Sequence, residues 1–145
     1  MSRIPRVQEH LKAGFTAEAA SAARFRANSA AAAREGLPNL AAHWLELARA
    51  KDELAILMLE ATGQARGGVE DLEAALAEER YENEVLYPRL ISAAGSEAEP
   101  FRQVVDIQVR HLSRLDALRG ALIASRGDVP NLPPVPAPDP VPVGQ

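Results

Sequence analysis

Polar side chains interrupt four apolar helical patterns in this chain, each near the middle of its pattern. The interrupting residues are Glu18, Lys51, Glu79 with Glu82, and Gln108 with His111. In a helical bundle such positions would meet in one buried layer, where a charge is costly unless it is paired or binds a metal ion. The residue types therefore predict either a metal site or a network of salt bridges.

The spacing of these residues suits convergence on one point. Glu79 and Glu82 are three residues apart, as are Gln108 and His111, and residues at this spacing share a helix face. Carboxylates bind hard cations, and imidazole suits iron, zinc or manganese. In carboxylate-bridged two-metal bundles, two helices supply one Glu each and two supply a Glu-x-x-His motif.

Four helices are predicted to carry these residues, over 6–35, 38–62, 69–94 and 97–125. Gly36 fits a C-terminal cap and Pro38 a first helical turn, whereas Pro88 falls inside the third helix and predicts a kink. No segment has a strand period. Short connections favour two helix hairpins, and we expect an all-α, antiparallel four-helix bundle in one domain, residues 1–126.

Composition restricts the function classes. The chain has 145 residues and a net charge of −4, with no basic stripe, so nucleic acid is not expected as a partner. It has no cysteine, which excludes disulfides and thiolate chemistry. No apolar run approaches the roughly 20 residues that span a bilayer, and the N-terminus lacks the apolar core of a signal peptide. We therefore expect a cytoplasmic protein without a membrane partner.

The last segment, residues 127–145, differs in composition from the rest. It holds Pro130, Pro133, Pro134, Pro136, Pro138, Pro140 and Pro142, out of 11 prolines in the chain. Such a segment forms polyproline II or irregular structure. It is either a solvated spacer or a docking peptide for a protein partner, since Val, Leu and Pro alternate in it.

The third predicted helix also resembles a known family. The run Glu79-Arg80-Tyr81-Glu82-Asn83-Glu84-Val85-Leu86-Tyr87-Pro88 is similar to the third helix of rubrerythrins, and Val109-Arg110-His111 to the end of their fourth. Residues 40–46, with the segment around Glu18 and Glu35-Gly36, resemble the first hairpin. The resemblance covers residues 8–125 and implies a ferritin-like fold. The absence of cysteine excludes a rubredoxin-like iron module.

The resemblance implies a depleted di-iron site. Glu18, Glu79, Glu82 and His111 match metal ligands of the family, and Tyr81 and Tyr87 match tyrosines near its metals. Lys51 and Leu54 replace the second-helix Glu-x-x-His, and Gln108 replaces a carboxylate. One ammonium could stand in for the missing cation. We therefore expect no cofactor, a salt bridge from Lys51 to at least one of Glu18, Glu79 and Glu82, and a polar network of Lys51, Gln108, Tyr81 and Tyr87. The alternative is iron or manganese held by the four surviving ligands.

Simpler interpretations exist for single residues. Lys51 could extend to water at a bundle edge, Glu79 and Glu82 could line a solvated face, and His111 could be a satisfied core residue. His43 and Glu46 fit an exposed helix face, and Met58 fits core packing better than haem ligation.

Three functions remain open: a non-catalytic binding or assembly module, expected as a homodimer; an oxidoreductase acting on oxygen or peroxide; and an accessory subunit addressed by its tail.

Overall fold

Helices dominate the computed structural model, which describes residues 5–125 and 127–135. In chain order they are α1 (Pro5–Arg34), α2 (Pro38–Thr62), α3 (Gly68–Tyr81), the π-helical turn η1 (Glu82–Leu86), α4 (Tyr87–Ala94), the 3₁₀ turn η2 (Gly95–Glu97) and α5 (Glu99–Ser125). Within these described ranges there is no strand, so the predicted all-α class is confirmed. None of the described helices combines the length and apolarity required to cross a membrane.

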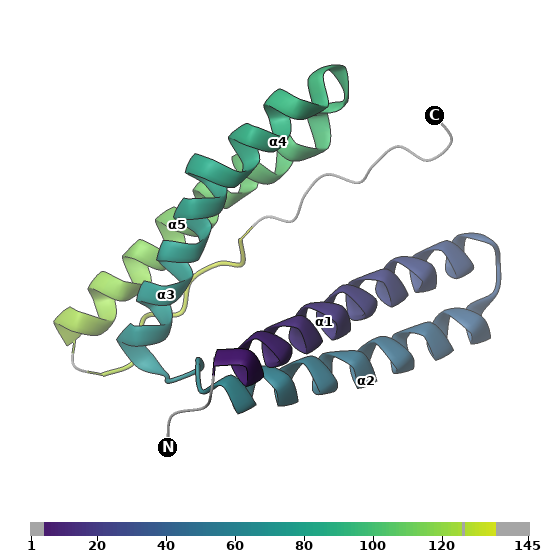
Figure 1. The fold of residues 1–145 in the computed structure, drawn as a ribbon, viewed down its shortest axis with the longest axis horizontal. Coiled ribbons are helices and arrows are strands. Elements are labelled where there is room, and N and C mark those ends of the chain that lie inside the picture. The colour runs from purple at the N-terminus through teal and green to yellow at the C-terminus, as the bar shows by residue number, and fades with distance from the viewer. Residues whose placement is uncertain (1–4, 126, 136–145) are drawn as a thin grey trace. The chain divides into compact units, whose positions relative to one another are not determined.

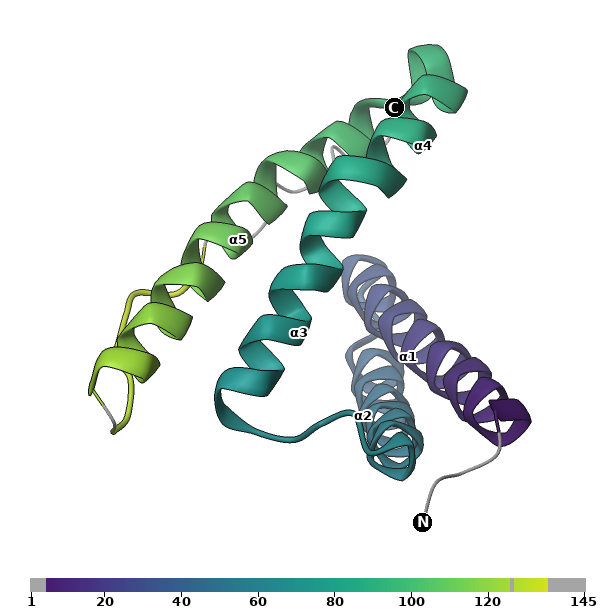
Figure 2. The same cartoon turned by 60° about the vertical axis from the view of Figure 1, so that its left-hand side comes forward.

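The first hairpin consists of α1 and α2, which lie side by side (Figures 1 and 2). Gly36 follows α1 with a φ of 78°, a left-handed conformation that suits glycine. Its N–H donates to the carbonyl of Ala33 and the N–H of Leu37 to that of Ala32, which is the Schellman pattern of a helix end. Pro38 then begins α2, where its missing N–H costs nothing. The predicted cap and helix start are both confirmed.

Small side chains fill the contact between α1 and α2. The buried residues of α2 are Ala41, Ala48 and Ala55, at intervals of seven, so they form one stripe. The Ser29 hydroxyl of α1 donates to the Ala41 carbonyl at 2.8 Å. Because helix separation depends on the side chains at the contact, this alanine stripe brings the two backbones close together.

The second hairpin packs α3 and α4 against α5 (Figure 1). Residues 68–94 are continuously helical, as predicted, but the predicted kink at Pro88 corresponds to a π-helical turn over Glu82–Leu86. In this turn the Tyr87 N–H donates to the Glu82 carbonyl, five residues earlier. Proline lacks an N–H and clashes with the preceding turn of an α-helix. The wider π turn just before Pro88 relieves that clash.

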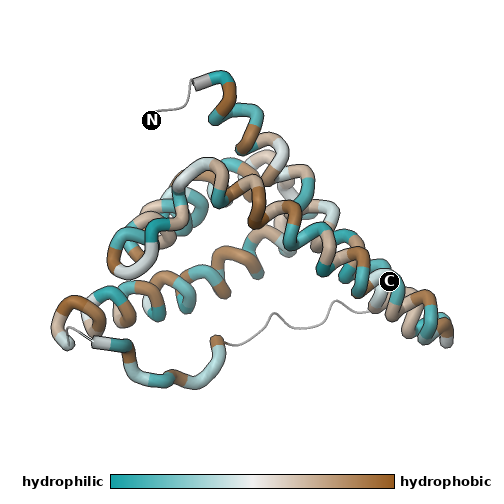
Figure 3. Tube along the Cα trace, turned by 90° about the horizontal axis from the view of Figure 1, so that it is seen from below, coloured by the Kyte–Doolittle hydropathy of each residue, from teal (hydrophilic) through white to brown (hydrophobic). Residues whose placement is uncertain are grey.

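Few side chains of the second hairpin are buried, and these include Leu76 and Ala98, at 4% and 0% exposure. No large side chain is fully buried anywhere in the described part of the chain. Hydrophobic and hydrophilic positions alternate over short intervals along the helices (Figure 3), as in amphipathic helices that need a partner surface.

The chain separates into two compact units between Ala65 and Arg66, with one hairpin in each. Each predicted pair of helices thus lies in one unit. Their union in one domain over 1–126, and in an antiparallel bundle, stays a prediction. Residues 127–135 have no helix or strand, as expected for the start of the tail, and residues 136–145 lie outside the described part.

Candidate functional site

The first hairpin joins two of the predicted polar residues. Lys51 Nζ lies 2.8 Å from Glu18 Oε2, with the two side chains 31% and 25% exposed. This contact is an ion pair between an ammonium and a carboxylate. The predicted salt bridge of Lys51 is therefore confirmed, with Glu18 as its partner. Lys51 is mostly covered, which differs from the simpler interpretation of a lysine extending into water.

The second hairpin brings Glu79 of α3 to His111 of α5. Glu79 Oε1 lies 3.3 Å from His111 Nδ1, and the side chains are 22% and 38% exposed. The other carboxylate oxygen, Oε2, is buried and has no hydrogen-bond partner. The pair resembles a carboxylate orienting an imidazole, with one acceptor left over.

A second polar pair lies next to this one. The Gln108 amide of α5 donates from Nε2 to Glu82 Oε2 at 2.9 Å. Asn83 donates from Nδ2 to the Val105 carbonyl at 3.4 Å. Gln108 Oε1 and Asn83 Oδ1 are buried acceptors without a partner. Glu82 and Asn83 both belong to the π turn, a distortion often found at functional sites.

Asn83 is not among the predicted site residues. The π turn explains why it contacts α5 together with Glu82. Two adjacent residues of an α-helix point about 100° apart, and the wider turn redirects the side chains. No propensity rule predicts a π turn, so Pro88 was the only available signal.

The two tyrosines lie in different surroundings. Tyr87 is half-buried, and its ring centroid is 6.4 Å from that of Phe101. Tyr81 is 55% exposed, and the described residues give its hydroxyl no polar partner. The participation of both tyrosines in a polar network stays a prediction.

Two other candidates behave as ordinary helix residues. His43 and Glu46 are 73% and 77% exposed, with 3.8 Å between Nδ1 and Oε2, as expected for a solvated helix face. Met58 packs against α1, where its sulfur lies 3.3 Å from the place that a Cβ at Gly14 would occupy. A larger residue at position 14 would displace this methionine.

The polar residues of the two hairpins are held by neighbouring side chains. Among the described residues, no group of three or more His, Asp or Glu side chains is arranged to hold an ion. Glu18 already has an ammonium at 2.8 Å, and an ammonium repels a metal ion. Glu79 and Glu82 have His111 and Gln108 as neighbours. Within each hairpin, these carboxylates are therefore paired with a neighbouring side chain and are not grouped around one point.

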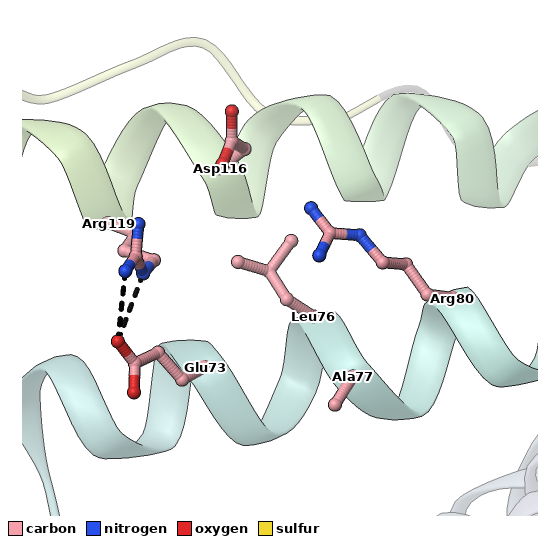
Figure 4. Close-up of a pocket in the computed structure, with 6 residues that line it drawn as sticks. All are labelled: Glu73, Leu76, Ala77, Arg80, Asp116 and Arg119. Atoms are coloured by element: carbon pink, nitrogen blue, oxygen red, sulfur yellow. Dashed lines mark hydrogen bonds and ion pairs between the residues drawn. The ribbon is translucent and has the colours of Figure 1, made fainter.

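A shallow hollow lies between α3 and α5, away from the polar pairs (Figure 4). Its wall includes the ion pair between Arg119 and Glu73, which are 3.1 Å apart and 39% and 52% exposed. Leu76 points from α3 toward α5 between Arg119 and Arg80. Apart from the buried Leu76, the lining residues are exposed or half-buried, as on a solvated helix face.

Comparisons with known proteins do not place the chain. A scan against protein-family models finds no match to it, and no curated protein matches it significantly.

Proposed function

We propose that this chain is a ferritin-like, rubrerythrin-like four-helix protein that works without a metal centre, as a binding or assembly module. One observation carries the proposal: each carboxylate at a ligand position implied by the resemblance already has a partner side chain in its own hairpin. The pairs are Glu18 with Lys51, Glu79 with His111, and Glu82 with Gln108.

Two of these partners stand where the family carries metal ligands. Lys51 supplies positive charge beside Glu18, and Gln108 replaces a negative group with an amide that donates to Glu82. Both substitutions reduce repulsion between carboxylates in the absence of a cation. Binding an ion at Glu18 or Glu82 would require these contacts to break first. The pairs therefore favour a polar network in place of a metal centre.

The exposed leucines of α2 support the four-helix arrangement. Leu40, Leu47 and Leu54 repeat every seven residues and are 45%, 49% and 44% exposed. Heptad-spaced leucines are typical of helix–helix contacts. We propose that this stripe packs inside an antiparallel four-helix bundle. Leu45 and Ile56, at 50% and 51% exposure, fall on another face of α2 and would serve a homodimer contact.

Metal analysis tests the proposal. The full chain is purified without chelator, and iron and manganese per chain are measured before and after anaerobic incubation with each ion. We expect far less than one ion per chain. Near-stoichiometric iron or manganese that survives dialysis would overturn the proposal.

A rebuilt variant sharpens this test. Lys51→Glu with Leu54→His restores the second-helix Glu-x-x-His, and Gln108→Glu restores the missing carboxylate. We expect the triple variant to bind metal where the parent does not. Adding Glu79→Gln and Glu82→Gln is the matched control, and it should remove the gained binding.

The homodimer is tested separately by sedimentation of the full chain. We expect a dimer that dissociates when Leu45 and Ile56 are both changed to Lys. A monomeric parent would contradict the assembly part of the proposal.

A second function, metal-dependent oxidoreductase chemistry with fewer ligands, is favoured by one observation. The second hairpin holds three buried acceptor oxygens without partners: Glu79 Oε2, Asn83 Oδ1 and Gln108 Oε1. Buried acceptors without a donor are uncommon and call for a water molecule, a cation or another donor. The metal analysis separates the two functions, because the second requires one bound ion per chain.

A further inference from the structure

The chain reverses direction after α5 and returns along that helix (Figures 1 and 2). Ser125 ends the helix, and its Oγ accepts from the Gly127 N–H at 3.2 Å. The Val129 N–H donates to the Asp128 carboxylate at 2.8 Å. These contacts form a hydrogen-bonded turn of the kind that Ser and Asp side chains stabilise.

A hollow on α5 receives the returning segment. Its α5 residues are Arg110, Ser113, Arg114 and Ala117, at the three- and four-residue spacing of one helix face, and Val135 completes it. The Arg114 guanidinium donates from Nη2 to the Pro133 carbonyl at 2.5 Å. This face is separate from the one that carries Gln108 and His111 toward α3. α5 therefore has two contact faces with different partners.

Burial along the segment has a pattern. Val129 and Val135 are half-buried, whereas residues 130–134 between them are exposed. The two valines are therefore the most covered residues of the segment, and Val135 is the one that lines the hollow.

The chemistry of the two surfaces is complementary. A proline-rich segment in an extended conformation makes no internal hydrogen bonds, so its carbonyls need donors. A guanidinium has five N–H donors and no acceptor. Ser113 and Ala117 are small and leave space for a valine side chain. This face of α5 thus provides hydrogen-bond donors for the backbone carbonyls of the segment and a shallow apolar recess for its valine side chains.

We propose that this outer face of α5 is a binding groove for an extended proline-rich peptide, and that its resident occupant is residues 129–135 of the same chain. A protein partner that takes the tail must then first displace it from α5. The groove does not depend on the metal content of the polar pairs.

Cross-linking in the full chain tests the proposal, because the chain has no cysteine of its own. Ser113→Cys with Val135→Cys places two thiols in the groove. Ser92→Cys with Val135→Cys is the matched control, since Ser92 is an exposed residue of α4 outside the groove. Both variants are treated with a short bismaleimide at low concentration, after circular dichroism confirms the helical fold.

We expect an intramolecular cross-link in the groove pair that forms much faster than in the control pair. Adding Arg114→Ala to the Ser113→Cys, Val135→Cys variant should slow the cross-linking reaction about three- to tenfold, because one hydrogen bond from a charged group is lost. Arg102→Ala, at an exposed ion pair of α5, should leave the rate unchanged. Equal rates in the groove and control pairs would overturn the proposal, as would cross-links formed only between two molecules.

Discussion

The two hairpins handle their interrupting polar residues differently. The first sets one carboxylate against one ammonium, Glu18 against Lys51, and so balances its charge. The second sets two carboxylates, Glu79 and Glu82, against an imidazole and an amide. An amide carries no charge, so the second hairpin keeps an excess of negative charge. Of the two hairpins, the second is the one whose paired residues leave a carboxylate charge unbalanced.

The two hairpins also differ in how their helices pack. The first hairpin closes on a stripe of alanines and a hydroxyl-to-backbone hydrogen bond. The second contains a π turn and three of the four buried acceptors without a hydrogen bond in the described residues; the fourth, Glu18 Oε2, has its ammonium. Close small-residue packing leaves little space for a ligand, whereas irregular helix geometry with free acceptors leaves some. The first hairpin is therefore closely packed with its polar pair balanced, whereas the second is irregular and keeps unpartnered acceptors.

The largest expected effect comes from the alanine stripe. Ala48 is 2% exposed, so Ala48→Leu forces α1 and α2 apart. We expect a loss of about 3 kcal/mol in the free energy of unfolding, the upper end for overpacking. Thermal denaturation should show a midpoint lowered by roughly 6–12 °C. Ala50→Leu, at an exposed position of the same helix, is the control and should change little. Equal midpoints for the two variants would contradict close packing.

Removing the ammonium of the first hairpin should have the next largest effect. Lys51→Met leaves the mostly covered carboxylate of Glu18 without a counter-charge. We expect the free energy of unfolding to fall by about 2 kcal/mol. Urea denaturation measures it. Glu18→Gln combined with Lys51→Met should recover part of the loss, because the unpaired charge is gone. Additive effects of the two single changes would show that the ion pair contributes no coupling.

Much of the fold was predictable because the signals are local. Helix ends at Gly36 and Pro38 follow from backbone chemistry, and apolar periodicity gave the four helical stretches. A salt bridge from Lys51 to one of Glu18, Glu79 and Glu82 was predictable from the residue types and the resemblance, whereas the choice of Glu18 comes from the structure. These features depend on residues close in sequence or on a single hairpin contact.

The rest depends on geometry that periodicity does not encode. The π turn at Glu82–Leu86 changes which side chains face α5, and it brings Asn83 to the Val105 carbonyl. The buried stripe of α2 is Ala41–Ala48–Ala55 and not the neighbouring leucines, which hydrophobicity alone would favour. Small residues that permit close backbone approach carry a weak hydrophobic signal.

A change at Gln108 tests the second hairpin. Gln108→Leu removes the donor to Glu82 and also removes the unpartnered acceptor Gln108 Oε1. The two effects oppose each other. We therefore expect the free energy of unfolding to fall by about 1 kcal/mol, which is less than for Lys51→Met. Glu82→Leu with Gln108→Leu should be close to the parent in urea denaturation. If Gln108→Leu lowers the free energy of unfolding more than Lys51→Met does, the comparison between the hairpins is wrong. The second hairpin would then have the stronger polar pairing.

The smallest effects on the free energy of unfolding are expected at exposed ion pairs. Each hairpin has one such pair between its helices. Arg26 and Asp52 are 2.8 Å apart and 50% and 48% exposed, and Arg119 and Glu73 are similarly placed in the second hairpin. Water and salt screen such pairs, so Arg26→Ala and Arg119→Ala should each cost about 0.5 kcal/mol or less. Double-mutant cycles with Asp52→Ala and Glu73→Ala measure the coupling. If the two coupling free energies are equal and small, the hairpins differ only in their buried polar residues. If they are unequal, the hairpins also differ in their surface ion pairs.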